Sequence, residues 1–117
     1  MLGGTRRQMV AKSKTALRWA AKSGHLEAVQ VLVDIMPREA LMAKDDDQKT
    51  ALHLATQGGH LETVQFLVDK MPQEALRAKD KYQSTALHWA ARDGHLGIVQ
   101  ALVDSIPLSV FRLVYSA

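Results

Sequence analysis

TALHLATQGGHLETVQFLVD, residues 50–69, is the stretch that decides the fold, because it recurs twice more at a constant offset. The copies are TALRWAAKSGHLEAVQVLVD at 15–34 and TALHWAARDGHLGIVQALVD at 85–104, and each neighbouring pair is identical at 13 of 20 positions. The connecting segments align as well, IMPREALMAKDDDQK at 35–49 with KMPQEALRAKDKYQS at 70–84. A repeat that keeps its register over three copies is typical of a solenoid of equivalent units.

Each unit predicts a short first helix, about residues 51–57 in the middle copy. Thr50, like the threonines at 15 and 85, is expected to be the N-cap, since its hydroxyl can accept a hydrogen bond from a first-turn amide. Gly59, like the glycines at 24 and 94, is expected to end the helix, because glycine tolerates a left-handed backbone.

A second helix is predicted from near Leu61 to Pro72, which stops it or starts the connection. Its apolar residues fall on one face at helical spacing: Leu61, Val64, Leu67 and Val68. The Glu-Ala-Leu sequence at 74–76 adds a further helical turn.

Helices this short are unstable alone in water, where about 12–15 residues are needed. They persist only when units stack on their neighbours. We therefore predict an all-α solenoid whose shared interior is lined by Leu17, Leu52 and Leu87. Residues 1–117 would form one domain, with repeats at about 10–44, 45–79 and 80–114 after a basic tail at 1–9.

The repeated motifs carry a family resemblance. Thr-Ala-Leu-His-Leu-Ala at 50–55 and Thr-Ala-Leu-His-Trp-Ala at 85–90 resemble the ankyrin signature Thr-Pro-Leu-His-x-Ala. The Gly-His-Leu after each first helix, and an aspartate five residues before the threonine at 45 and 80, match as well. The resemblance covers about residues 10–104. It implies helix-turn-helix repeats joined by loops or hairpins, which bind partners through loop tips and the concave face of the first helices.

The sequence also departs from the family pattern. Alanine replaces the usual proline in all three units, and the unit is longer than the usual length of about 33 residues. Gln48 and Gln83 stand where glycine is common in the hairpin loop. In the first unit, Arg18 replaces the histidine. These departures bear on the tight shape of the hairpin loop, which stays an open question at this point, and not on the pair of helices.

Composition narrows the class of protein. Hydrophobic residues make up 47% of the 117 residues, and cysteine is absent. A disulfide scaffold is thereby excluded, and we expect a cytoplasmic or other reducing intracellular compartment. No apolar run reaches the length of about 18 residues that a membrane span requires. The net charge is +3, and basic residues crowd the N-terminal end: Arg6, Arg7, Lys12, Lys14, Arg18 and Lys22.

Catalytic and metal-binding chemistry were weighed against structural roles. The histidines recur with the repeat, and the resemblance implies that His53 and His88 form local hydrogen bonds that brace neighbouring loops. No zinc-ligand spacing occurs. The acidic run 45–47 lacks the pattern of a calcium loop. We therefore predict no enzyme activity, no catalytic residues, no metal and no cofactor.

The candidate binding residues are those that differ between units within the fixed frame. Trp19 and Trp89 occupy the position that Leu54 fills in the middle unit, and they could be core residues or anchors on the concave face. The predicted partner-binding residues are Lys14, Lys22, Asp46, Asp47, Lys49, Gln57, Lys81, Tyr82, Ser84, Trp89, Arg92 and Asp93.

Three hypotheses about function follow. A non-catalytic module that binds a protein partner is the first. The alternative is an anion-binding element whose basic end holds nucleic acid or acidic lipid, or an ankyrin segment of a larger multidomain protein. The apolar residues after Pro107 also predict self-association through the C-terminal tail.

Overall fold

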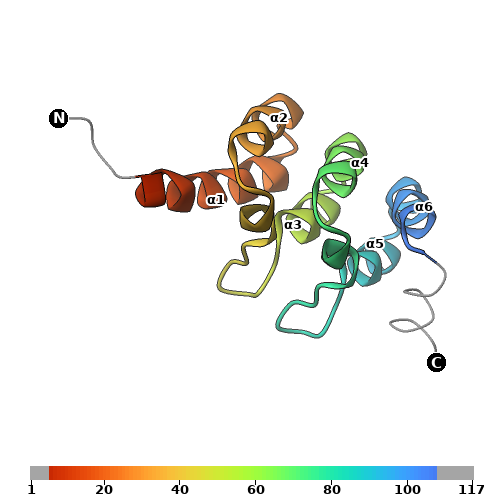
Figure 1. The fold of residues 1–117 in the computed structure, drawn as a ribbon. Coiled ribbons are helices and arrows are strands. Elements are labelled where there is room, and N and C mark those ends of the chain that lie inside the picture. The colour runs from red at the N-terminus through yellow and green to blue at the C-terminus, as the bar shows by residue number, and fades with distance from the viewer. Residues whose placement is uncertain (1–5, 108–117) are drawn as a thin grey trace.

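The computed structural model describes the backbone of residues 6–107 and the side chains of residues 12–107. This part of the chain is entirely helical, as predicted (Figure 1). Its elements are α1 (Arg6–Ser23), α2 (Leu26–Ile35), the 3₁₀ turn η1 (Arg38–Met42), α3 (Ala51–Gln57), α4 (Leu61–Lys70), the 3₁₀ turn η2 (Gln73–Arg77), α5 (Ala86–Asp93) and α6 (Leu96–Ser105). The C-terminal tail to which self-association was assigned lies outside the described residues.

The helices form two rows. The first helices of the three units, α1, α3 and α5, pack side by side, and α2, α4 and α6 form a second row against them (Figure 1). The loops at 43–50 and 78–85 project together from one side of this stack. The two rows and the projecting loops give the molecule an inner side, made by the first helices and the loops, and an outer side.

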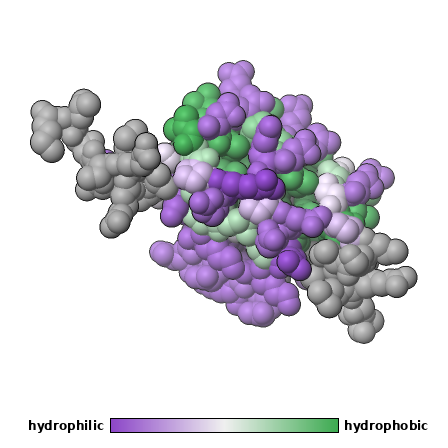
Figure 2. Space-filling view, viewed as in Figure 1, coloured by the Kyte–Doolittle hydropathy of each residue, from purple (hydrophilic) through white to green (hydrophobic). Residues whose placement is uncertain are grey.

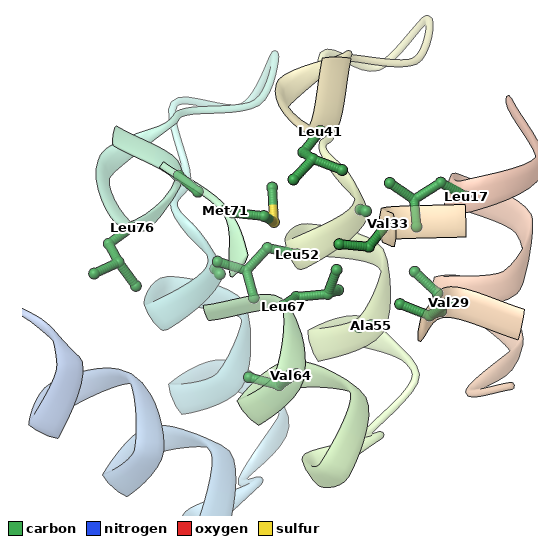
Figure 3. Close-up of a cluster of buried hydrophobic side chains, with 14 of the residues drawn as sticks. Leu17, Val29, Val33, Leu41, Leu52, Ala55, Val64, Leu67, Met71 and Leu76 are labelled. Atoms are coloured by element: carbon green, nitrogen blue, oxygen red, sulfur yellow. The ribbon is translucent and has the colours of Figure 1, made fainter. Parts of the chain in front are cut away.

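The interior runs continuously through the units, as Figure 3 shows. Leu17 and Leu52 are buried, and Leu87 packs against the same cluster, which confirms the predicted shared interior. Burying a leucine side chain contributes roughly 1.5–3 kcal/mol, so stacking supplies the stability that these short helices lack alone. One part of the predicted stripe is wrong: Leu61 is 37% exposed, and Thr63 is buried in its place.

Local sequence explains where the first helices begin. The hydroxyls of Thr50 and Thr85 accept from the amides of His53 and His88, and each histidine ring accepts in return from the threonine amide. This reciprocal arrangement is a capping box. The same prediction for Thr15 is wrong, because α1 continues through it from Arg6, within the segment expected to be a tail. The preceding residues RRQMVAKSK are mostly good helix formers, and no aspartate turn interrupts them.

The glycines end the first helices as predicted. Gly24, Gly59 and Gly94 have φ near +73° or +74°, in the left-handed region. Space also matters at Gly24, where an added Cβ would clash with the His60 ring. The second helix of the middle unit ends just before Pro72, and η2 supplies the expected helical turn over the Glu-Ala-Leu sequence.

The surface is hydrophilic on the side of the loops, whereas hydrophobic residues gather over α2 (Figure 2). On that helix, Val31 is 63% exposed and Ile35 is 65% exposed. Within residues 6–107, no helix combines the length and the apolar character needed to cross a membrane.

Candidate functional site

Two aspartates shape the projecting loops. The Oδ1 atom of Asp45 accepts from the amides of Asp47 and Lys49, each at 2.9 Å. Asp80 repeats this pattern with the amides of Tyr82 at 2.9 Å and Ser84 at 3.0 Å. Burial alone would raise the pKa of Asp80, but bonds from the Ser84 amide, the Trp89 indole and the Tyr82 amide outweigh it and lower the pKa. Both loops are therefore held by internal carboxylates.

The tight turns that the sequence left open are formed in both loops. Gln48 and Gln83 adopt φ values of 64° and 62°, the conformation that glycine takes more readily. The amide of Gln48 donates to the Asp45 carbonyl at 2.9 Å, and that of Gln83 donates to the Asp80 carbonyl at 3.0 Å. The aspartate networks thus hold glutamine in a backbone conformation that it does not favour by itself.

The loops are also connected to each other. The amide of Lys81 donates to the Asp47 carbonyl at 3.0 Å, and its ammonium lies 2.7 Å from the Asp47 carboxylate. The hydrogen bond and charge pairing between these two side chains lower the pKa of Asp47 and raise that of Lys81. Lys44 donates to the Lys79 carbonyl at 3.0 Å. The two loop tips consequently form one surface.

Histidine joins helix to loop. The Nδ1 atom of His53 accepts from the Thr50 amide, so the hydrogen lies on Nε2, which donates to the Ser84 carbonyl at 3.0 Å. Burial is the main reason that the pKa of His53 is lowered, and the ring is held neutral. This bracing role confirms the expectation for His53, and His88 forms the matching local bond with the Thr85 amide. In the second set, Nε2 of His60 lies 3.0 Å from the Lys22 carbonyl and ties two units together.

An aromatic and cationic cluster lies beside the second loop. The indole N–H of Trp89 donates to the Oδ2 atom of Asp80 at 2.7 Å. Tyr82 meets Trp89 edge to face, with ring centroids 6.3 Å apart. The Lys49 ammonium lies 4.9 Å from the Trp89 centroid and 5.6 Å from that of Tyr82. The Arg92 guanidinium lies 5.2 Å from the Trp89 centroid.

Three hollows on the inner side share lining residues and form a groove across the units. The first, of about 200 Å³, is lined by Thr15, Arg18, Trp19, Lys22, Asp45 and Leu54. The second, of about 380 Å³, is lined by Lys22, Asp45, Asp47, Lys49, Leu54, Gln57 and Gly58. The third, of about 440 Å³, is lined by Lys49, Tyr82, Ser84, His88, Trp89 and Arg92. We call this continuous surface the inner groove.

The structure brings most of the predicted binding residues to this groove. Eight of them line it directly, and Lys81 is attached through its ion pair with Asp47. The eight are Lys22, Asp47, Lys49, Gln57, Tyr82, Ser84, Trp89 and Arg92. Asp46 is exposed on the loop tip, and Asp93 is exposed at the end of α5. Lys14 is half-buried on α1.

Some expectations need correction. Trp19 is 65% exposed, so it is not a core residue, and Trp89 lies half-buried at the groove. Lys49, expected on the loop surface, is only 8% exposed. Arg18 and Leu54 line the groove but were not among the predicted binding residues. Their positions in the repeat could have identified both residues. Arg18 occupies the position of His53, and Leu54 occupies the position of both tryptophans.

The carboxylates of the groove are engaged in bonds within the protein. Residues 12–107 hold no group of three or more histidine, aspartate or glutamate side chains that could bind a metal ion. The carboxylates of Asp45 and Asp80 accept from backbone amides, and that of Asp47 pairs with Lys81.

Stacked helix pairs with joined loops and a groove along the first helices define a helical repeat protein. A family model described as ankyrin repeats, in three copies, matches residues 17–110. The chain therefore belongs to the ankyrin repeat family. Ankyrin repeats are generally protein–protein interaction modules. Comparison with individually curated proteins gives no significant match.

Proposed function

We propose that this chain is a non-catalytic module that holds a protein partner in the inner groove, using the loop tips and the first helices. The observation that carries the proposal is the gathering of Trp19, Tyr82, Trp89 and Arg92 along one groove. Tryptophan, tyrosine and arginine are the residues most enriched among binding hot spots.

Hydrogen bonds hold the walls of the groove in place, which favours binding. Asp80 fixes the Tyr82 backbone and the Trp89 indole together, and His53 fastens α3 to the second loop. A surface that is already ordered loses less conformational entropy when a partner binds. The axes of neighbouring first helices lie about 8–10 Å apart. With the width of the helices included, three of them span about 30 Å, which is enough for a standard interface of about 800 Å² per partner.

The basic end of the chain is the reason to consider nucleic acid or acidic lipid instead. Lys14, Arg18 and Lys22 are spaced by four residues and fall on one face of α1. Two of them, Arg18 and Lys22, line the groove beside Asp45. Arg18 and Lys22 therefore belong to the same groove, which is lined by both cations and carboxylates.

The proposal is tested by placing a photo-crosslinking residue in the groove at Gln57 and, as a control, on the outer side at Val31. In a cell extract, we expect protein adducts from position 57 that disappear when Trp89 is replaced by alanine. Adducts from position 31 that match those from position 57, or adducts made only with nucleic acid or lipid, would contradict the proposal.

A further inference from the structure

Lys49 is an unusual residue for a groove wall. Its side chain is more than nine-tenths buried, yet within the described residues its ammonium has no carboxylate partner within salt-bridge distance. It lies over the Trp89 and Tyr82 rings and lines both the second and the third hollow. The Asp47 carboxylate acts on the Lys49 charge only at longer range. A ligand carboxylate could therefore add a direct, charge-assisted hydrogen bond, an interaction that Lys49 does not already make within the described residues.

Arg92 places a second cation beside Lys49 in the third hollow. Its guanidinium also lies over Trp89 and lines the third hollow with Lys49. Asp80, the carboxylate nearest to the indole, is 2% exposed and is already bound by two amides and the indole N–H. The third hollow therefore presents two cations over an aromatic floor. A ligand cation is disfavoured there, because the ammonium of Lys49 already occupies the aromatic faces.

The repeat places a second, similar pair at the other end of the groove. Trp19 and Lys22 occupy in the first unit the positions of Trp89 and Arg92 in the third. The Lys22 ammonium lies 5.8 Å from the Trp19 centroid, and Arg18 lines the same hollow. Leu54 and Gln57 fill these positions in the middle unit, so the first helix between the two tryptophan–cation pairs carries no cation at these positions.

The charges between the two pairs decide the kind of partner. Asp45 and Asp47 line the second hollow beside Lys22 and Lys49, so two carboxylates lie between the two tryptophan–cation pairs, and cations flank them on both sides. A nucleic acid strand, with a phosphate at every nucleotide, would place negative charge against these carboxylates. A peptide with two separated acidic side chains matches the pattern instead.

We propose that the inner groove recognises an extended acidic peptide, with one carboxylate in the Lys49–Arg92 hollow and a second at the Trp19–Lys22 pair. Two steps between first helices, each about 8–10 Å, separate the pairs by about 16–20 Å. An extended chain rises about 3.3 Å per residue, so the two acidic residues are about five or six positions apart. This inference rests on the proposed function and specifies the partner's chemistry.

The probes are capped peptides with two glutamates three, six or nine positions apart in a neutral threonine and alanine frame. Binding is followed by the two indole N–H signals in ¹H–¹⁵N NMR spectra, assigned with Trp19→Phe. We expect the six-position peptide to shift both signals and to bind about tenfold more tightly than the other spacings or its glutamine analogue, as for a charged hydrogen bond. Equal affinity at all spacings, or tighter binding of a lysine pair or a thymidine oligonucleotide, would overturn the proposal.

Variants complete the test. Lys49→Met should weaken binding of the six-position peptide about tenfold, and Arg92→Gln, at an exposed position, gives an independent measure if the first variant folds poorly. Lys70→Met is the matched control, since it removes a cation 5.8 Å from the Phe66 centroid on α4, outside the groove. A loss with Lys70→Met equal to that of the groove variants would refute the assignment. If position 57 still crosslinks to a protein while these peptides fail to bind, only the proposed acidic specificity is wrong. If position 57 also fails to crosslink, the assignment of the groove as the binding site is wrong as well.

Discussion

Asp80 is the residue whose replacement most sharply tests how the groove is built. Its two oxygens accept three N–H groups, two from the loop and one from Trp89. Asparagine has the same shape but only one accepting oxygen. In Asp80→Asn, whichever way the amide turns, its NH₂ group faces either the loop amides or the indole, donor against donor.

The cost follows from the bonds that are lost. A hydrogen bond to a charged group contributes about 1.5–3 kcal/mol, and a neutral one about 0.5–1.5 kcal/mol. Asp80→Asn loses the bond to Trp89 and weakens the two loop bonds, so we expect a loss of about 2–4 kcal/mol in the free energy of unfolding. The matched change, Asp45→Asn, should cost about 1 kcal/mol, because Asp45 uses one oxygen only and an asparagine carbonyl can accept both amides.

The assay is urea denaturation followed by far-ultraviolet circular dichroism, with the midpoint and the slope fitted separately. A double-mutant cycle with Trp89→Phe isolates the indole bond. Once the indole is gone, Asp80→Asn should cost about as much as Asp45→Asn. Equal losses for the two asparagine variants in the wild-type background, or no coupling to Trp89, would refute this account of the loop.

Other predictions concern buried and strained positions. Thr56→Val should stabilise the protein by about 1 kcal/mol, because the Thr56 hydroxyl is buried without a hydrogen-bond partner among the described residues; a destabilised variant in urea melts would contradict this. Gln48→Gly should stabilise by up to about 1 kcal/mol by relieving its left-handed backbone, and unchanged melts would argue against strain there. Gly94→Ala should cost about 1–2 kcal/mol through backbone strain alone, and Gly24→Ala clearly more, because its Cβ would also meet the His60 ring; thermal melts that rank them in reverse would refute the packing argument. Finally, the lowered pKa of His53 means that stability is fully present above pH 6.5 and falls below it, by about 1.4 kcal/mol per pH unit until the folded-state pKa is reached. In His53→Gln this fall should be reduced, and an unchanged pH profile in urea melts would show that another group is responsible.

Much of the fold could be predicted from the repeat, because the same signals for helix starts, helix ends and buried positions recur in three copies. The glycine stops, the middle helix at 51–57 and the shared leucine interior all follow from local propensity and from the need to stack. Thr15 shows the limit of this reasoning. Its signature matches that of the other threonines, but the preceding residues favour helix and override the cap.

The candidate groove was predicted less completely. Comparing the units identified Tyr82, Trp89 and Arg92 as positions that differ. Such a comparison does not predict how deeply each side chain is buried. The burial of Lys49 depends on the two aromatic rings that cover it, and one of these comes from the neighbouring loop and the other from α5. The bond between Trp89 and Asp80 likewise depends on side-chain directions that sequence spacing does not specify.

The most direct test of the central claim is hydrogen exchange measured by mass spectrometry on the chain with and without the protein partner captured through position 57. The account predicts slower exchange in the loops at 43–50 and 78–85 and at the ends of α3 and α5 that border the groove. Protection confined to α2, α4 and α6, with the loops unchanged, would contradict it.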